Sequence, residues 1–204
     1  LHALTAALDG YAAARQILEQ QHPLPIYEAD QMRYRILVAR QPLLFLTGQA
    51  AQQAVELTAL RQLAHRLPDP AQQADILLKE ADFMAKVRAE QATAVTLSQQ
   101  ALTLAEQHNL PRRAAEAWSV IGEARHVQGA YQESATALQQ AVTIWETLGD
   151  SPQALLGAYL QLLYSERMNG RWAEGKALAQ KLITLAQAVH PFAVKQLQIR
   201  AQQR

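Results

Sequence analysis

The chain has 204 residues with a net charge of +1, and 50% of its residues are apolar against 18% charged. This apolar content is enough for a packed core and excludes bulk disorder, while the balanced charge gives no sign of a nucleic acid or an anionic membrane as a partner. The absence of cysteine excludes disulfides and thiolate metal sites, and it fits a reducing compartment such as the cytoplasm.

The strong helix formers Ala, Leu, Gln, Arg and Glu dominate the sequence, so we expect an all-α fold. Charged residues interrupt each long apolar stretch, and we expect no membrane-spanning helix. At the N-terminus, residues 1–8 end a first helix and residues 11–21 form its partner. Residues 26–47 then form a long helix, kinked or broken at Pro42, and residues 50–66 pair with it.

Prolines recur at nearly constant intervals along the rest of the chain. Steps of 41, 41 and 39 residues separate Pro70, Pro111, Pro152 and Pro191. A helix tends to end before a proline, and proline suits the first turn of the next helix. A helix pair is therefore expected to start after each of these prolines, with Asp69 and Ser151 as N-caps.

Two further sets of residues repeat with the same period. Small residues that permit a tight turn between helices stand 41, 40 and 41 residues apart, at Gly48, Ala89, Gly129 and Gly170. Just past the turn comes an aromatic residue, at Tyr131 and Trp172, with Tyr11 as an earlier equivalent. Steps of 40 and 41 residues also separate Ala101, Ala141 and Leu182. Repetition at this length predicts a helical solenoid.

Each pair has to pack on two sides. In the helix after Gly129, one apolar stripe consists of Tyr131, Ala135, Leu138, Val142 and Trp145. An adjacent stripe consists of Ser134, Ala137, Ala141, Ile144 and Leu148. One stripe can face the partner helix and the other the next pair, so the pairs are expected to stack.

We therefore expect an α-α superhelix of about ten to eleven helices, forming a single domain over residues 1–204. Its expected units are residues 1–22 (partial), 26–66, 71–108, 112–148, 152–189 and 192–204 (partial). Because both ends fall inside a unit, we expect the sequence to be a fragment of a longer protein.

The pattern resembles the tetratricopeptide repeat (TPR), in which a Trp-x2-Leu-Gly core is followed by Gly-x-Tyr at the turn and an alanine-rich second helix. The match is best at Trp118, Ile121, Gly122, Gly129, Tyr131, Leu138 and Ala141. Ser134 replaces the usual first alanine of the second helix. The usual repeat has about 34 residues, and the longer version here is similar to the repeat arrays of bacterial STAND-type ATPases and regulators. The resemblance implies a non-enzymatic protein–protein interaction module in a signalling or transcriptional regulator.

In this family the first helices of the pairs line a concave groove that binds a protein or peptide. The resemblance places eleven residues there: Lys79, Phe83, Lys86, Glu116, Ser119, Glu123, His126, Leu160, Tyr164, Arg167 and Met168. The plainer alternative is that the charges form a solvated face and the aromatic residues belong to the core. Phe83 stands where chaperone-binding repeats have asparagine, so chaperone tails are not expected partners.

No cofactor or metal site is predicted, because the sequence has no HExxH or HxH pattern and no phosphate-binding loop. The main alternative function is a sensor that binds a peptide or small ligand in the groove. Glu116 and Glu123 share a helical face, but an α/α-type enzyme is the less favoured class because nothing sets them into a sugar cleft.

Arg112 and Arg113 could contact an acidic partner, although a solvated connector is the default. Open solenoid ends favour weak self-association, through residues 192–204 or 1–21. Finally, Gly122→Leu should lower the melting temperature, because Gly122 lies where the two helices of a pair approach closely.

Overall fold

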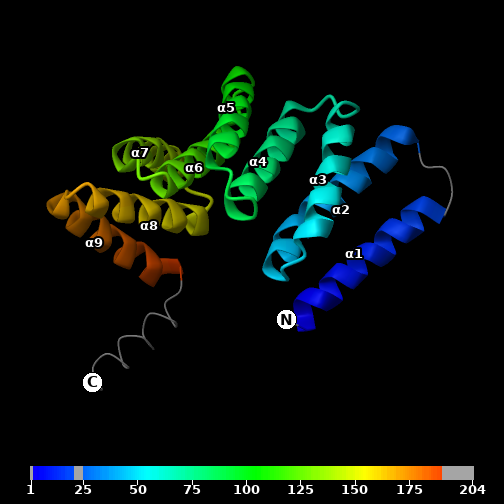
Figure 1. The fold of residues 1–204 in the computed structure, drawn as a ribbon, viewed down its shortest axis with the longest axis horizontal. Helices are drawn as coiled ribbons and strands as arrows, with labels where there is room; N and C mark the ends of the chain where they lie inside the picture. The colour runs from blue at the N-terminus through cyan, green and yellow to red at the C-terminus, as the bar shows by residue number, and fades with distance from the viewer. Residues whose placement is uncertain (1, 21–24, 190–204) are drawn as a thin grey trace. The chain divides into compact units, whose positions relative to one another are not determined.

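The computed structural model describes residues 2–20 and 25–189, and every regular element in these ranges is a helix. The helices are α1 (His2–Gln20), α2 (Ile26–Leu46), α3 (Ala50–Ala64), α4 (Pro70–Lys86), α5 (Gln91–Gln107), α6 (Pro111–Val127), α7 (Tyr131–Leu148), α8 (Pro152–Met168) and α9 (Trp172–Val189), as Figure 1 shows. The all-α prediction is confirmed for the described residues. They contain nine helices rather than ten to eleven, and the helix expected at 192–204 lies outside them.

The predicted break between residues 8 and 11 is wrong, because α1 runs unbroken through Gly10. Tyr11 follows Gly10 directly, whereas one residue separates Gly129 from Tyr131, so the turn pattern is not complete here. A glycine inside a helix costs only about 1 kcal/mol relative to alanine. The helix can therefore continue through Gly10.

The predicted break at Pro42 is also absent, since α2 continues through it. Proline removes the bond to the carbonyl four residues earlier, but the side chains on either side hold the helix in place. Leu37 and Leu44 are both buried, and the Gln41 side-chain amide donates to the Leu37 carbonyl at 3.2 Å. Pro42 itself is exposed, so its ring lies on the solvent side of the helix.

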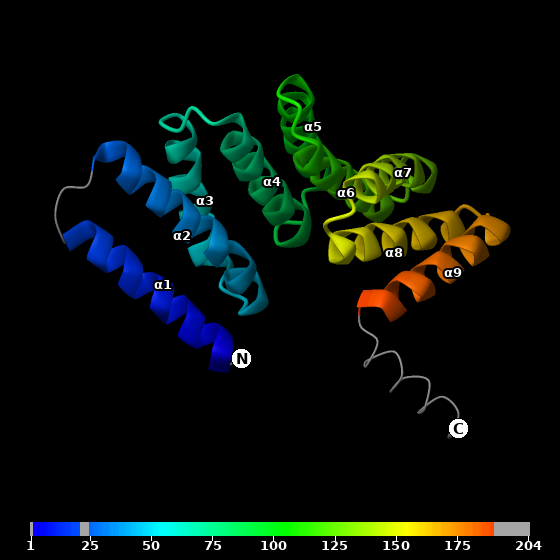
Figure 2. The same cartoon turned by 180° about the vertical axis from the view of Figure 1, so that it is seen from behind.

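The chain divides into two compact units, Leu1–Asn109 and Leu110–Arg204, called unit 1 and unit 2 below. In unit 1 each helix from α1 to α5 packs on the next, and α2 also contacts α4. In unit 2 each helix from α6 to α9 packs on the next, and α6 also contacts α8, as Figures 1 and 2 show. Within each unit, this packing of consecutive helices fits a solenoid.

The turn between the two helices of a pair has a recurring backbone geometry. Residues with positive φ follow the first helix, at Gly48 (70°), Ala89 (57°), Gly129 (78°) and Gly170 (74°). After each glycine, the next N–H donates to the carbonyl five residues earlier, as Ala130 does to Arg125 at 3.0 Å. This is the Schellman motif. At Ala89 the bond spans six residues, from Glu90 to Met84 at 2.8 Å.

The predicted proline starts are confirmed for three helices, since Pro70, Pro111 and Pro152 each occupy the first helical turn. Asp69 caps α4 by accepting from the Ala71 N–H at 2.9 Å. Ser151 holds the N-cap position of α8, but its side chain makes no capping bond. Its hydroxyl instead accepts from Arg112 at 2.7 Å.

Each unit has its own hydrophobic core. In unit 1 the core packs Tyr34, Leu37, Leu57, Leu60, Leu63, Leu67, Ile76 and Phe83 together. In unit 2 it packs Ala115, Ala135, Leu138, Ala141, Val142, Trp145, Ala158, Tyr159 and Leu162, with Trp118 against them. Both predicted stripes of α7 are buried or partly buried, as two-sided packing requires.

Candidate functional site

The first helices of the two pairs in unit 2, α6 and α8, carry most of the predicted groove residues. The α6–α8 face is defined here as Glu116, Ser119, Glu123, His126, Leu160, Tyr164, Arg167 and Met168. On each helix these residues follow one another at steps of three or four, apart from the adjacent pair Arg167 and Met168, so they share one helical side. The α6 residues are partly buried and the α8 residues are exposed.

An apolar stripe runs along the α8 part of this face. Leu160, Tyr164 and Met168 are spaced by four residues, and their exposed fractions are 39%, 47% and 50%. Residues four apart lie one above another on a helix, so the three side chains form one continuous strip. Such a strip of large apolar side chains on the surface is a typical mark of an interaction site.

Two polar residues of the face, Glu116 and Ser119, make hydrogen bonds within α6. Glu116 accepts two hydrogen bonds from Arg113, at 2.9 and 3.1 Å. The Ser119 hydroxyl donates to the Ala115 carbonyl at 2.9 Å. On α8, Arg167 is exposed near the helix C-terminus, where a positive charge suits the helix dipole.

His126 begins a chain of hydrogen bonds that joins α6, α7 and α8. Its Nδ1 lies 2.9 Å from the Ser165 hydroxyl, which lies 2.8 Å from the Ser134 hydroxyl. The Ser134 hydroxyl in turn donates to the Gly122 carbonyl at 2.7 Å. Ser134 and Ser165 are fully buried, and His126 is partly buried with its ring edge against Tyr131.

The carbonyl at the end of this chain sets the direction of every bond in it. A carbonyl only accepts, and each hydroxyl has a single proton. The Ser134 hydroxyl donates its one proton to the Gly122 carbonyl, so the Ser165 hydroxyl must donate to Ser134. The Nδ1–H of His126 must then donate to the Ser165 hydroxyl. The buried chain therefore fixes the tautomer of the neutral His126 ring and leaves Nε2 as its acceptor. It also explains Ser134, the one departure from the repeat pattern in this pair.

The three remaining predicted residues lie on α4 of unit 1. Phe83 is not available as a surface residue, because it is only 7% exposed and packs in the unit 1 core. Its large apolar side chain fills space between helices, which was the plainer alternative for the aromatic residues. Lys79 is partly buried, and Lys86 is exposed and pairs with Asp82 at 3.0 Å.

Arg112 contacts an acidic residue of its own unit. Its guanidinium donates to Asp150 at 2.6 Å and to Ser151 at 2.7 Å, and it lies over the Trp145 ring at 5.8 Å. Arg113 pairs with Glu116. These contacts tie the start of α6 to the connector that precedes α8.

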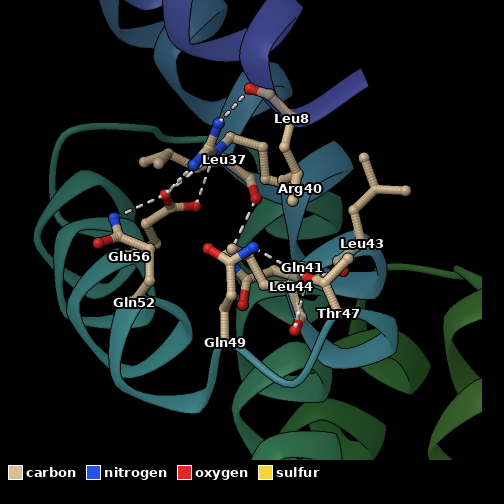
Figure 3. Close-up of polar contacts among 10 residues, drawn as sticks. All are labelled: Leu8, Leu37, Arg40, Gln41, Leu43, Leu44, Thr47, Gln49, Gln52 and Glu56. Carbon is tan, nitrogen blue, oxygen red and sulfur yellow. Dashed lines mark hydrogen bonds and ion pairs between the residues drawn. The ribbon is translucent and has the colours of Figure 1, made fainter. Parts of the chain in front are cut away.

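Sequence reasoning missed a set of buried charges in unit 1, which Figure 3 shows around Arg40. Arg40 Nε donates to both carboxylate oxygens of Glu56, at 2.9 and 3.1 Å, and Nη1 donates to the Leu8 carbonyl at 2.9 Å. Gln52 also donates to Glu56, at 3.0 Å. Because Arg40 and Glu56 are buried, this pair links α1, α2 and α3 and is costly to break.

A spacing signal for other buried contacts was present in the sequence. Tyr34 donates to Asp75 at 2.6 Å, and Gln31 bonds with Gln72, and both pairs are 41 residues apart. That separation equals the repeat period, so the partners hold equivalent places on α2 and α4. Complementary polar residues one period apart could have predicted these bonds.

The described residues hold neither a metal-binding cluster nor a membrane-spanning helix. Across residues 2–20 and 25–189, no group of three His, Asp or Glu side chains converges as a metal site requires. In the same ranges no helix is both long enough and apolar enough to cross a membrane.

No protein-family model and no curated protein matches this chain. Among solved structures, the chain is similar to the crystal structure of BtubC (BKLC) from P. vanneervenii, with a TM-score of 0.75. The match covers 92% of this chain and 75% of that one, at 11% sequence identity. At this identity the similarity shows a shared fold alone.

Proposed function

We propose that this chain is a non-enzymatic interaction module, built as a TPR-like solenoid of long repeats, and that it binds a protein segment on the α6–α8 face. The proposal rests on one observation, the exposed apolar stripe of Leu160, Tyr164 and Met168. The resemblance to the repeat arrays of bacterial STAND-type regulators supports a role in a cytoplasmic signalling protein, and the absence of cysteine agrees with a reducing compartment.

The stripe fits an amphipathic helix better than an extended peptide. A helix that lies in a groove makes contact through apolar side chains spaced by three or four residues, and the stripe offers matching steps of four on α8. Arg167 stands at the C-terminal end of the stripe and is exposed. We therefore expect the bound helix to carry an acidic residue at the end that meets Arg167.

The test is selection of helical peptides from a displayed library on the full chain, followed by affinity measurement with variants. Tyr164→Ala should weaken binding of the selected peptides by about tenfold or more, because aromatic anchors commonly contribute 2 kcal/mol or more at interfaces. Arg167→Glu should weaken the binding of peptides with an acidic end and should strengthen the binding of peptides with a basic end.

Trp172→Ala is the matched control, because Trp172 is another large aromatic residue of unit 2 and is 68% exposed on α9. It should leave the affinities unchanged. Peptides that bind equally well to the wild type and to Tyr164→Ala would overturn the proposed face.

A further inference from the structure

A cavity of about 250 Å³ lies between α1, α2 and α3 of unit 1, and none of its lining residues belongs to the α6–α8 face. Five apolar side chains of α2 and α3 line it: Ile36, Leu37, Val55, Ala59 and Leu63. Leu37 and Leu63 are buried, so they form its floor, and Val55 is 64% exposed. The volume lies below the range of about 300–1,000 Å³ that is usual for drug-sized ligands, so the cavity suits a smaller one.

Arginines surround the apolar lining. Arg15 of α1, Arg33 of α2 and Arg66 after α3 all line the cavity. The side chains of Arg33 and Arg66 are 40% and 54% exposed, which places them at the opening. Glu56 is the one carboxylate in the lining, and Arg40 already holds both of its oxygens.

Arg33 and Arg66 share one counter-ion. Asp30 is buried, and it accepts from Arg33 Nη1 at 3.1 Å and from Arg66 Nη2 at 3.0 Å, with Arg66 Nε 2.8 Å from its second oxygen. One carboxylate carries a single negative charge, so two guanidiniums on it leave one positive charge uncompensated. Each guanidinium also has five N–H groups, and those not directed at Asp30 remain able to donate to a ligand.

We propose that this cavity binds a small carboxylic acid with an apolar body. The carboxylate lies on Arg33 and Arg66, and the apolar body lies against Leu37, Ala59 and Leu63. A monoanion matches the single surplus charge, and guanidinium groups match carboxylate geometry well. The inference does not depend on the proposed function, because the cavity lies in unit 1 and its ligand is not a protein segment.

The test is isothermal titration calorimetry of the full chain with octanoate. We expect one octanoate to bind per chain. Octanol tests the need for a charge, octylammonium tests the sign of the charge, and acetate tests the need for the apolar body. Octanol and octylammonium lose the charge-assisted hydrogen bond, and acetate loses several buried CH₂ groups. Each should therefore bind at least about tenfold more weakly than octanoate.

Two variants each remove one arginine that would contact the ligand, while buried Asp30 keeps an arginine partner. Arg33→Gln leaves Asp30 paired with Arg66, and Arg66→Gln leaves it paired with Arg33. Each should weaken octanoate binding by about tenfold. Arg35→Gln is the matched control, because it removes the same charge from an exposed position of α2 outside the cavity, and it should leave the affinity unchanged.

Methyl NMR spectra of the same samples locate the ligand. Octanoate should shift the signals of Val55 and Leu63 and leave those of Leu162 in unit 2 in place. The proposal is overturned if octanoate does not bind, if octanol binds as well as octanoate, if Arg33→Gln and Arg66→Gln both bind like the wild type, or if the shifts fall outside unit 1.

Discussion

At the scale of single residues, two positions show how a side chain is matched to the backbone around it. Gly122 is the first. A Cβ atom placed on it would lie 2.5 Å from Leu138 Cγ and 2.8 Å from Leu138 Cδ2. Leu138 is fully buried, so it has to shift within the packed core to admit the extra atom. The close approach of α6 and α7 that was expected at this glycine is thus visible as a contact with one named side chain.

We predict that Gly122→Ala lowers the free energy of unfolding by about 1–3 kcal/mol through overpacking. Gly157→Ala is the control, because Gly157 is also helical and has nothing within 4 Å of its added Cβ. That change should raise the free energy of unfolding by about 0.5–1 kcal/mol, the gain from alanine in a helix. Urea titration of both variants measures the two values. Equal gains would show that Leu138 accommodates the methyl group.

Ala89 is the second position, since it adopts φ 57° at a turn where the equivalent residues are glycine. The left-handed conformation is unfavourable for a residue with a Cβ. We predict that Ala89→Gly raises the free energy of unfolding by about 0.5–1 kcal/mol. Calorimetric melts measure the resulting rise in melting temperature. The same substitution at Ala177, an exposed helical position in α9, should lower the melting temperature.

At the scale of helices, α8 is tied to its neighbours α7 and α9 through Tyr159. The Tyr159 hydroxyl donates to Glu146 of α7, and Lys181 of α9 lies 5.7 Å from the centre of the Tyr159 ring. Burial of the phenol, together with the hydrogen bond to Glu146, raises the pKa of Tyr159 from 10 to about 12. The folded state therefore favours the neutral phenol.

This raised pKa makes the stability of unit 2 dependent on alkaline pH. The contribution of Tyr159 is fully present below about pH 10, and it is lost as the pH rises towards about 12. We predict that Tyr159→Phe removes this part of the fall in unfolding free energy between pH 10 and pH 12. Denaturant titrations at several pH values measure the slope of the free energy of unfolding against pH. Tyr164→Phe, at an exposed tyrosine of the same helix, should keep the wild-type slope.

The helices were predictable where proline and glycine mark both ends of a pair. The bounds of α4 to α9 follow the prolines and the positive-φ residues closely. The predicted breaks at Gly10 and Pro42 are absent, because one glycine costs a helix only about 1 kcal/mol and because the buried side chains on either side of Pro42 hold α2 together. Contacts such as Ser134 with Ser165 needed the relative register of three helices, which periodicity alone does not supply.

The candidate site was predictable to a smaller extent. Helical spacing identified Leu160, Tyr164 and Met168, and the structure leaves all three exposed. Spacing could not distinguish them from Phe83, which holds an equivalent position but is buried by the core of unit 1. The arginines of the unit 1 cavity gave no signal, because they come from α1, α2 and the turn after α3, with no common interval.

At the scale of the whole molecule, stacked helical pairs leave an unpaired face at each end of an array. In α9 only Gly175 is fully buried, and Trp172 and Ile183 are exposed. We predict weak, concentration-dependent dimers, which light scattering over a range of protein concentrations measures. A strict monomer at high concentration would contradict this. The prediction of a single domain stays a prediction. So do the parts of the predicted helices that fall on residues 21–24 and 190–204.

The distribution of tryptophan gives the two units separate optical signals. Trp118, Trp145 and Trp172 are the only tryptophans in the sequence, and all three belong to unit 2. Tryptophan fluorescence, excited selectively, therefore reports on unit 2 alone, whereas far-ultraviolet circular dichroism sums the helices of both units. A fatty acid seated in unit 1 would shift part of the dichroism melt and leave the emission melt unchanged, so the native chain needs no label to show which half has responded.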